Sequence, residues 1–176
     1  MNLKSIRNIY FIGIGGVGMS ALAKYLVSVG KTVGGYDKKP SPATDSLIDL
    51  GVSIQFEANS SNIHESFTDP LKTLVVFTPA VSQTNQLLNY FKSNSFQVLK
   101  RSEVLGIVTK NTLCLAVAGT HGKTTTTSIL AHLLYQNNEK MTAFVGGVSE
   151  NYQSNFIQLG TEISVVEADE YDRSFL

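Results

Sequence analysis

Short runs of apolar residues alternate along the chain with segments in which apolar residues recur every three or four positions. In the first part of the chain the runs predict strands at 9–12, 32–36, 52–54, 74–77 and 96–99. The segments between them predict amphipathic helices at 17–29, 43–50 and 85–92. Strands that alternate with helices at this spacing indicate βαβ units. The pattern therefore predicts an α/β fold with a Rossmann-like parallel sheet.

A second α/β unit is predicted after this sheet. Its predicted strands are 113–118, 142–145 and 163–166, and its predicted helix, which follows a glycine turn, is 123–136. We divide the chain into a Rossmann-like domain at 1–108 and the start of a P-loop domain at 109–176. The boundary rests on the order of the motifs, because no proline-rich linker marks it. Three strands are few for such a sheet, so we expect a truncated domain and a longer natural protein.

Composition and charge narrow the class of protein. Hydrophobic residues make up 43% and charged residues 16% of the chain, which predicts a packed core. The 14 Lys and Arg residues balance the 14 Asp and Glu residues, so no electrostatic feature suggests nucleic acid or a membrane as a partner. No apolar stretch reaches the ~20 residues that span a bilayer. The single cysteine, Cys114, is expected to be a buried core residue, and its isolation fits a cytoplasmic protein.

The first chemical motif is Gly13-Ile14-Gly15-Gly16-Val17-Gly18, which lies between a predicted strand and a predicted helix. Its glycines allow a tight turn and the close approach of a diphosphate to the backbone amides at the start of the helix. Asp37 ends the second predicted strand, where its carboxylate can accept hydrogen bonds from a nucleotide ribose or base. A nicotinamide dinucleotide and a UDP-sugar both fit, because each carries a diphosphate.

The second motif is Gly119-Thr120-His121-Gly122-Lys123-Thr124-Thr125, which follows an apolar strand and opens a helix. Its core is that of a phosphate loop, in which backbone amides and Lys123 bind the phosphates of ATP and the Thr124 hydroxyl binds Mg²⁺. The strict pattern requires an earlier glycine at position 117, where this chain has Val117. The position between strand and helix nevertheless favours ATP binding.

A phosphate loop needs a carboxylate to complete its metal site, and the acidic cluster after 163–166 provides candidates. Glu167 is the first choice as Mg²⁺ ligand because it directly follows the apolar run. Asp169 and Glu170 are the alternatives. His64 and His132 match no motif, so we expect them to have structural roles.

The run from Gly119 to Thr125 resembles the ATP-binding motif of the Mur ligase superfamily, which explains Val117. Histidine at position 121 resembles both its alanine-adding branch and the related murein peptide ligases. The segments 11–20 and 167–176 resemble the alanine-adding branch, although Tyr171 is also similar to the murein peptide ligases. The likeness extends in order along the whole chain. It implies a three-domain enzyme with a UDP-binding domain, a central ATPase domain and a carboxy-terminal domain, of which this chain holds the first and the start of the second.

The resemblance also implies a reaction that belongs to peptidoglycan precursor synthesis. The lactyl carboxylate of UDP-N-acetylmuramate would be activated by ATP as an acyl phosphate, and L-alanine would then form the amide. Lys123 and Glu167 would be catalytic, and the loop with Gly13, Gly15, Gly16, Val17 and Gly18 would bind the diphosphate. By likeness alone, Thr78, Arg101 and Asn155 would contact the substrate. A murein peptide ligase and a nicotinamide-binding module are the alternatives, and we expect the 176-residue chain alone to be inactive.

Overall fold

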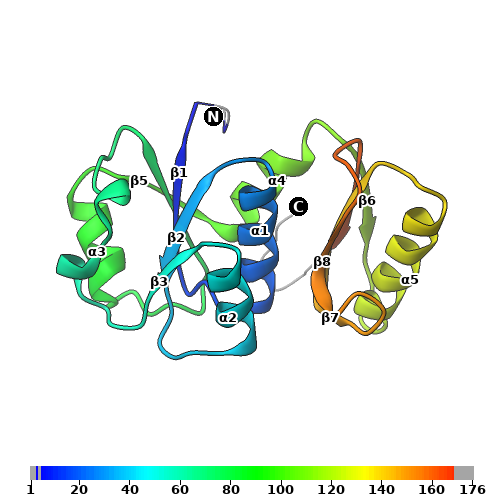
Figure 1. Cartoon of the computed structure of the whole chain (residues 1–176), viewed down its shortest axis with the longest axis horizontal. Coiled ribbons are helices and arrows are strands. Elements are labelled where there is room, and N and C mark those ends of the chain that lie inside the picture. Colours follow the sequence, from blue (N-terminus) through cyan, green and yellow to red (C-terminus); the bar gives the residue numbers. More distant parts are fainter. Residues whose placement is uncertain (1–2, 4, 169–176) are drawn as a thin grey trace. The chain divides into compact units, whose positions relative to one another are not determined.

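The computed structural model describes residue 3 and residues 5–168. The chain divides into two compact units, one ending at Val104 and the other beginning at Leu105 (Figure 1). Both are built from strands and helices, which confirms the predicted α/β class. The division lies within a helix, α4 (Arg101–Thr109), and the boundary proposed from the sequence lies at the end of that helix.

The first unit contains a five-stranded parallel sheet with the strand order β3-β2-β1-β4-β5. Its strands are β1 (Asn8–Ile12), β2 (Thr32–Tyr36), β3 (Ser53–Gln55), β4 (Thr73–Phe77) and β5 (Gln97–Lys100). Its α-helices before α4 are α1 (Val17–Ser28), α2 (Pro42–Asp49) and α3 (Gln86–Ser93), and its 3₁₀ turns are η1 (Ser60–Asn62) and η2 (Glu65–Phe67). Helices α1 and α2 cover one face of the sheet and α3 the other (Figure 1). This arrangement confirms the Rossmann-like prediction.

The strand order reverses between β1 and β4, which are direct neighbours in the sheet. They pair in parallel from Asn8↔Thr73 to Ile12↔Phe77. In open α/β sheets, ligands bind at the carboxyl ends of the strands that flank such a reversal. The glycine loop follows β1, so it lies at this position.

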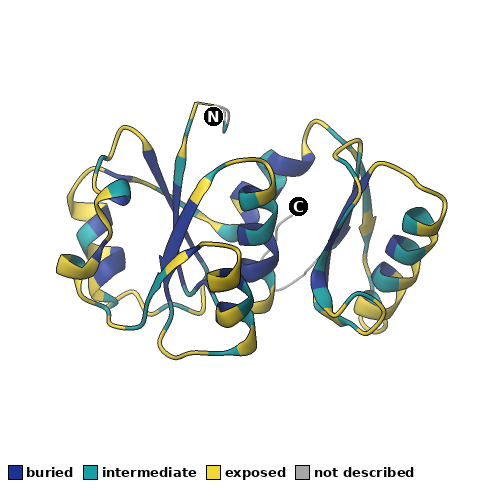
Figure 2. Cartoon of the chain, viewed as in Figure 1, coloured by how far each residue is buried: buried dark blue, intermediate teal, exposed yellow. Residues whose placement is uncertain are grey.

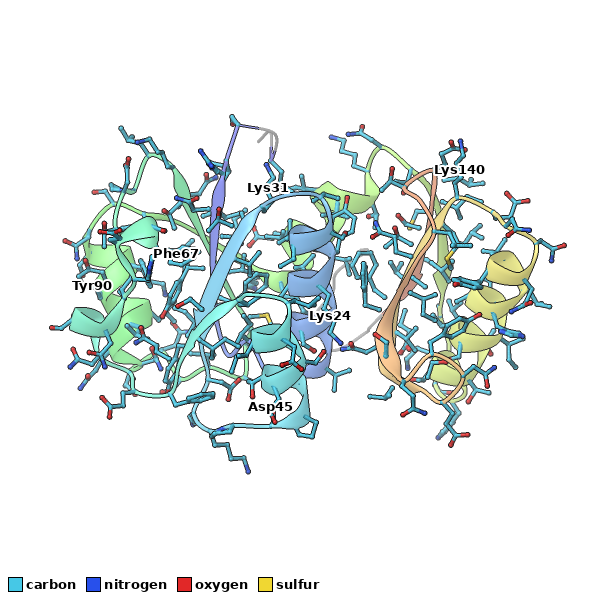
Figure 3. The ribbon with its side chains drawn as sticks, viewed as in Figure 1. Lys24, Lys31, Asp45, Phe67, Tyr90 and Lys140 are labelled. Carbon is cyan, nitrogen blue, oxygen red and sulfur yellow. The ribbon has the colours of Figure 1, made fainter. Side chains whose placement is uncertain are left out.

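An aromatic cluster fills the side of the sheet that faces α3. The Phe67 ring, labelled in Figure 3, lies 5.5 Å from the Tyr10 ring in an edge-on arrangement. A Cβ on Gly34 would lie 2.5 Å from the Phe67 ring, so only glycine at this place in β2 lets Phe67 reach the sheet. The central strands that carry this core are the most buried part of the unit (Figure 2).

The second unit contains a four-stranded sheet with the order β6-β9-β7-β8. Its elements are β6 (Leu113–Val117), α5 (Lys123–Gln136), β7 (Met141–Ser149), β8 (Ser154–Gln158) and β9 (Ile163–Glu167). Strands β6, β9 and β7 are parallel, whereas β8 pairs with β7 in antiparallel fashion. The expectation of three strands was therefore wrong, because β7 continues past its predicted end and turns back to form β8.

Two further features differ from the sequence-based expectations. Helix α4 was not predicted, although its Val104, Leu105 and Val108 are buried. Cys114 is half-buried rather than fully buried, because β6 is an edge strand of its sheet. Within the described part of the chain, no helix has the length and apolar character required to cross a membrane.

Candidate functional site

The glycine loop of the first unit turns the chain sharply between β1 and α1. Gly13 adopts a positive φ of 86°, which a residue with a side chain rarely takes. The N–H groups of Gly13 and Ile14 both donate to the Tyr36 carbonyl, at 2.8 and 3.0 Å, and so tie the turn to the end of β2. Gly16 is the N-cap of α1 and contributes no side chain to it. The amino end of α1 therefore faces the loop without a capping side chain, as suits an anion site.

Asp37 is bound to this loop directly. Its Oδ2 accepts a hydrogen bond from the Gly15 N–H at 2.7 Å, and its Oδ1 accepts one from the Lys38 N–H at 2.7 Å. A Cβ on Gly15 would lie 2.9 Å from Asp37 Oδ2 and 3.1 Å from Thr44 Cγ2. Gly15 is thus packed against protein atoms, and Asp37 holds the loop in place. The contact of Asp37 with a ribose or base stays a prediction.

Two further candidates from distant parts of the sequence meet the same loop. Arg101, the first residue of α4, lies against Gly18, since a Cβ on Gly18 would be 2.7 Å from Arg101 Nη1 and 3.2 Å from its Cδ. Thr78, just after β4, lies against Gly13, since a Cβ there would be 3.4 Å from Thr78 Cγ2. The structure therefore gathers the glycine loop, Asp37, Thr78 and Arg101 at the strand-order reversal.

The second motif forms a turn between β6 and α5. Gly119 and Gly122 have positive φ values of 149° and 76°, and Gly122 is the N-cap of α5, again without a side-chain cap. The Lys123 Nζ donates to the Gly119 carbonyl at 2.7 Å, so the ammonium lies over the loop. Thr120, His121 and Thr125 are exposed around it. Backbone amides, a lysine and exposed hydroxyls thus surround the amino end of a 14-residue helix, where phosphate binding is favourable.

Glu167 ends β9 beside this loop. Strands β6 and β9 pair in parallel with Val117 opposite Glu167, so the phosphate loop and the carboxylate leave the same edge of the sheet. The Thr124 hydroxyl donates to Glu167 Oε2 at 3.2 Å. The Gly146 N–H donates to Glu167 Oε1 at 2.7 Å. Sequence reasoning missed Gly146, although its place in a glycine pair just after a predicted strand was a signal of close approach.

The oxygen atoms of Thr124 and Glu167 are suitable ligands for a small divalent cation. A hydroxyl oxygen and a carboxylate oxygen lie side by side, and Mg²⁺ is commonly bound by one or two protein oxygens together with nucleotide phosphates. Among the described residues, no group of three or more His, Cys, Asp or Glu side chains could hold a metal by itself. Asp169 and Glu170, the alternative ligands, lie outside the described residues.

The remaining candidates lie outside the two glycine loops. Asn155 lies in β8 and is only 5% exposed, so it is a buried polar residue of the sheet. The His132 Nδ1 lies 2.9 Å from the Tyr152 hydroxyl and links α5 to the β7–β8 turn. His64 Nδ1 accepts from the Ser66 N–H at 3.3 Å at the start of η2. The two histidines have structural contacts, as expected from the sequence.

Comparison with known proteins identifies the family of this chain. The model of the "Mur ligase family, catalytic domain" matches residues 8–112, and that of the "Mur ligase middle domain" matches residues 117–173. The chain belongs to the Mur ligase family. The resemblance inferred from its motifs is thereby confirmed.

Several Mur ligases are similar to this chain along almost all of its length. The UDP-N-acetylmuramate–L-alanine ligase of Flavobacterium psychrophilum is 57% identical over 100% of this chain, and that of Phocaeicola vulgatus is 49% identical over 99%. The chain spans only 39% and 38% of the length of these two curated relatives.

Solved structures of related ligases are similar to the structure of this chain. The UDP-N-acetylmuramate-alanine ligase from Thermotoga maritima is similar with a TM-score of 0.83 and 32% identity, over 93% of this chain and 37% of that one. A UDP-N-acetylmuramate:L-alanyl-gamma-D-glutamyl-meso-diaminopimelate ligase from Neisseria meningitides has a TM-score of 0.83 and 27% identity, over 96% of this chain and 54% of that one. These matches do not favour a nicotinamide-binding module.

Proposed function

We propose that this Mur ligase chain is part of an ATP-dependent ligase that joins L-alanine to the lactyl carboxylate of UDP-N-acetylmuramate. The observation that carries the proposal is the position of the Thr124 hydroxyl, 3.2 Å from the Glu167 carboxylate, beside Lys123 on a phosphate loop. The glycine loop of the first unit supplies a separate diphosphate site. The names of relatives that are 57% and 49% identical support L-alanine and UDP-N-acetylmuramate as the substrates.

We assign the domain at residues 1–108, which contains the first unit, to the UDP-sugar and the domain at residues 109–176 to ATP. In the first unit, the turn at Gly13 and the uncapped start of α1 would receive the diphosphate. Arg101 lies on Gly18 in the first turn of α1, where its guanidinium can bond phosphate oxygens. Asp37 would hold the shape of the loop through Gly15 while the ligand binds. Asn155, which is buried in β8, is kept as a weaker substrate candidate.

The second unit would activate the carboxylate. The lactyl carboxylate and the γ-phosphate are both anionic, so their approach requires positive charge around the phosphates. Lys123 and the amides at the start of α5 would hold the phosphates in line with the carboxylate. Thr124 and Glu167 would hold Mg²⁺, which offsets phosphate charge when it is bound. Attack of the lactyl carboxylate on the γ-phosphorus would form an acyl phosphate and ADP. The alanine amine would then displace phosphate to form the amide.

The proposed reaction also suggests where the protein works. It consumes ATP and makes a precursor of peptidoglycan, so we place it in the cytoplasm, where ATP is available. The half-buried Cys114, as the single cysteine of the chain, fits a reducing compartment.

A calorimetric titration of this chain with UDP-N-acetylmuramate and with NADH tests the proposal. We expect heat of binding for the UDP-sugar at concentrations where NADH gives none. The Gly15→Val variant should lose the signal, because its side chain would collide with Asp37 and Thr44 and distort the loop. Gly106→Ala is a control for replacing a glycine outside the loop, since nothing lies within 4 Å of a Cβ at that position. Tighter binding of NADH than of the UDP-sugar would refute the proposal.

A further inference from the structure

Gly146 lies in β7, two residues beyond the last pair, Phe144↔Val166, that the strand makes with β9. At this point the N–H of Gly146 is no longer part of the ladder. It donates instead to Glu167 Oε1 at 2.7 Å, while Glu167 Oε2 accepts from the Thr124 hydroxyl at 3.2 Å. The two oxygens of one carboxylate are therefore bound by two different partners, one on β7 and one on α5.

The Glu167 carboxylate occupies the space that a side chain at position 146 would need. A Cβ there would lie 2.6 Å from Glu167 Oε2 and 2.9 Å from both Oε1 and Cδ. Gly146 is not among the glycines with positive φ, so its backbone conformation is open to other residues. Space for the carboxylate is the reason for glycine here. The colliding atoms form the end of a flexible side chain, so alanine would displace the carboxylate rather than the strand.

We propose that Gly146 is a positioning residue that makes Glu167 a one-oxygen ligand for Mg²⁺. Its N–H holds Oε1, while Oε2, which accepts from the Thr124 hydroxyl, keeps a second lone pair for the cation. Mg²⁺ requires near-octahedral geometry and is usually bound by few protein oxygens, so a fixed single oxygen beside a hydroxyl suits it. Hydrogen-bond partners that orient metal-binding carboxylates commonly affect affinity by 10- to 100-fold. The inference rests on the proposed metal role of Thr124 and Glu167.

Paramagnetic Mn²⁺, used in place of Mg²⁺ and followed by electron paramagnetic resonance, tests this role without enzyme turnover. The chain is titrated with Mn²⁺ in the presence of a non-hydrolysable ATP analogue, and binding beyond that of the nucleotide alone is measured. Gly146→Ala should weaken Mn²⁺ binding by about 10-fold or more. Gly106→Ala, whose new methyl group meets open space, should leave it within about twofold.

A double-variant comparison tests whether Gly146 acts through Glu167. Glu167→Gln should weaken Mn²⁺ binding, and adding Gly146→Ala to it should cause no further loss, because the group being positioned is already gone. Losses that multiply in the double variant would overturn the inference. So would a Gly146→Ala variant that binds Mn²⁺ normally while Glu167→Gln does not. Normal binding by Glu167→Gln, or no binding by the unaltered chain, would instead refute the metal assignment itself.

A second variant covers the case in which Gly146→Ala fails to fold, which thermal unfolding would reveal. Glu167→Asp keeps Gly146 but shortens the side chain, so that its carboxylate cannot reach the N–H of β7 and the hydroxyl of α5 together. We expect a loss of Mn²⁺ affinity similar to that of Gly146→Ala. Unchanged affinity in this variant would show that the two-sided hold on the carboxylate has no role in metal binding.

Discussion

Replacing Gly18 by alanine should separate the stability of α1 from the function of the glycine loop. Gly18 lies in the first turn of α1, and a Cβ there would be 2.7 Å from Arg101 Nη1 and 3.2 Å from its Cδ and Cζ. Separations below 3.0 Å are not sustained, so the guanidinium must move away. The helix itself gains, because alanine in place of glycine stabilises a helix by about 0.5–1 kcal/mol.

The expected cost falls on ligand binding. Hydrogen bonds to a charged group contribute about 1.5–3 kcal/mol, so losing the proposed contact of Arg101 with the diphosphate should weaken binding of UDP-N-acetylmuramate by roughly 10- to 150-fold. Isothermal titration calorimetry measures the affinity, and urea unfolding of the same samples measures the stability. Gly106→Ala, in α4 with nothing within 4 Å of its new methyl group, controls for the change of glycine to alanine in a helix.

Two results would refute this reasoning. If Gly18→Ala bound the UDP-sugar as tightly as the unaltered chain, Arg101 would have no part in the site. If the variant lost more than about 1 kcal/mol of stability, the contact between Arg101 and Gly18 would be needed for folding rather than for binding.

Three further predictions concern single side chains. Lys123→Ala should weaken ATP binding about 10-fold or more and leave UDP-sugar binding unchanged, as measured by calorimetry; equal losses for both ligands would contradict separate sites. Tyr10→Phe should stabilise the chain by about 1 kcal/mol, because the buried Tyr10 hydroxyl has no hydrogen-bond partner among the described residues. Burial also raises the pKa of Tyr10 in the folded chain above its ordinary value of 10.0. The free energy of unfolding is therefore unaffected by this group below pH 10 and falls as the pH rises above 10, because the hydroxyl ionises more readily in the unfolded chain. Urea unfolding between pH 9 and 11 should therefore show a steeper loss for the unaltered chain than for the phenylalanine variant, and parallel curves would contradict this. Burial raises the pKa of the Cys114 thiol more than the Thr109 hydrogen bond lowers it, so maleimide labelling should be slow at pH 7 and accelerate above about pH 9; rapid labelling at pH 7 would contradict it.

The first sheet could be predicted from the sequence because its signals are local. Apolar runs such as that of β4, where all residues from Thr73 to Phe77 are buried, end at turns marked by glycine or polar residues. The glycine loop then fixes where β1 stops and α1 starts. Two contacts could not be predicted, because each joins residues far apart in the chain. Asp37 accepts a hydrogen bond from the Gly15 N–H, and Arg101 lies against Gly18.

The missed elements form for tertiary reasons. Helix α4 contains Gly106 and several β-branched residues, which have low helix propensity, and it is instead supported by its buried Val104 and Leu105. In β8, the buried positions are Asn155 and Ile157, so a polar residue occupies a place where the alternating pattern of a strand would have an apolar one. The glycine pair after the predicted strand indicates a close approach at Gly146, but that its partner is Glu167 depends on how β7 and β9 pair.

The pairing of β6 with β9, in which Val117 lies opposite Glu167, limits where residues can be inserted into this chain by design. Successive side chains of a strand point to opposite faces, so one residue inserted into β9 would send the carboxylate to the wrong side of the sheet. An insertion of two residues would restore the side but shift the carboxylate by about 6.6 Å, beyond reach of Thr124. Length changes are therefore tolerable in the loops between strands and not within β9.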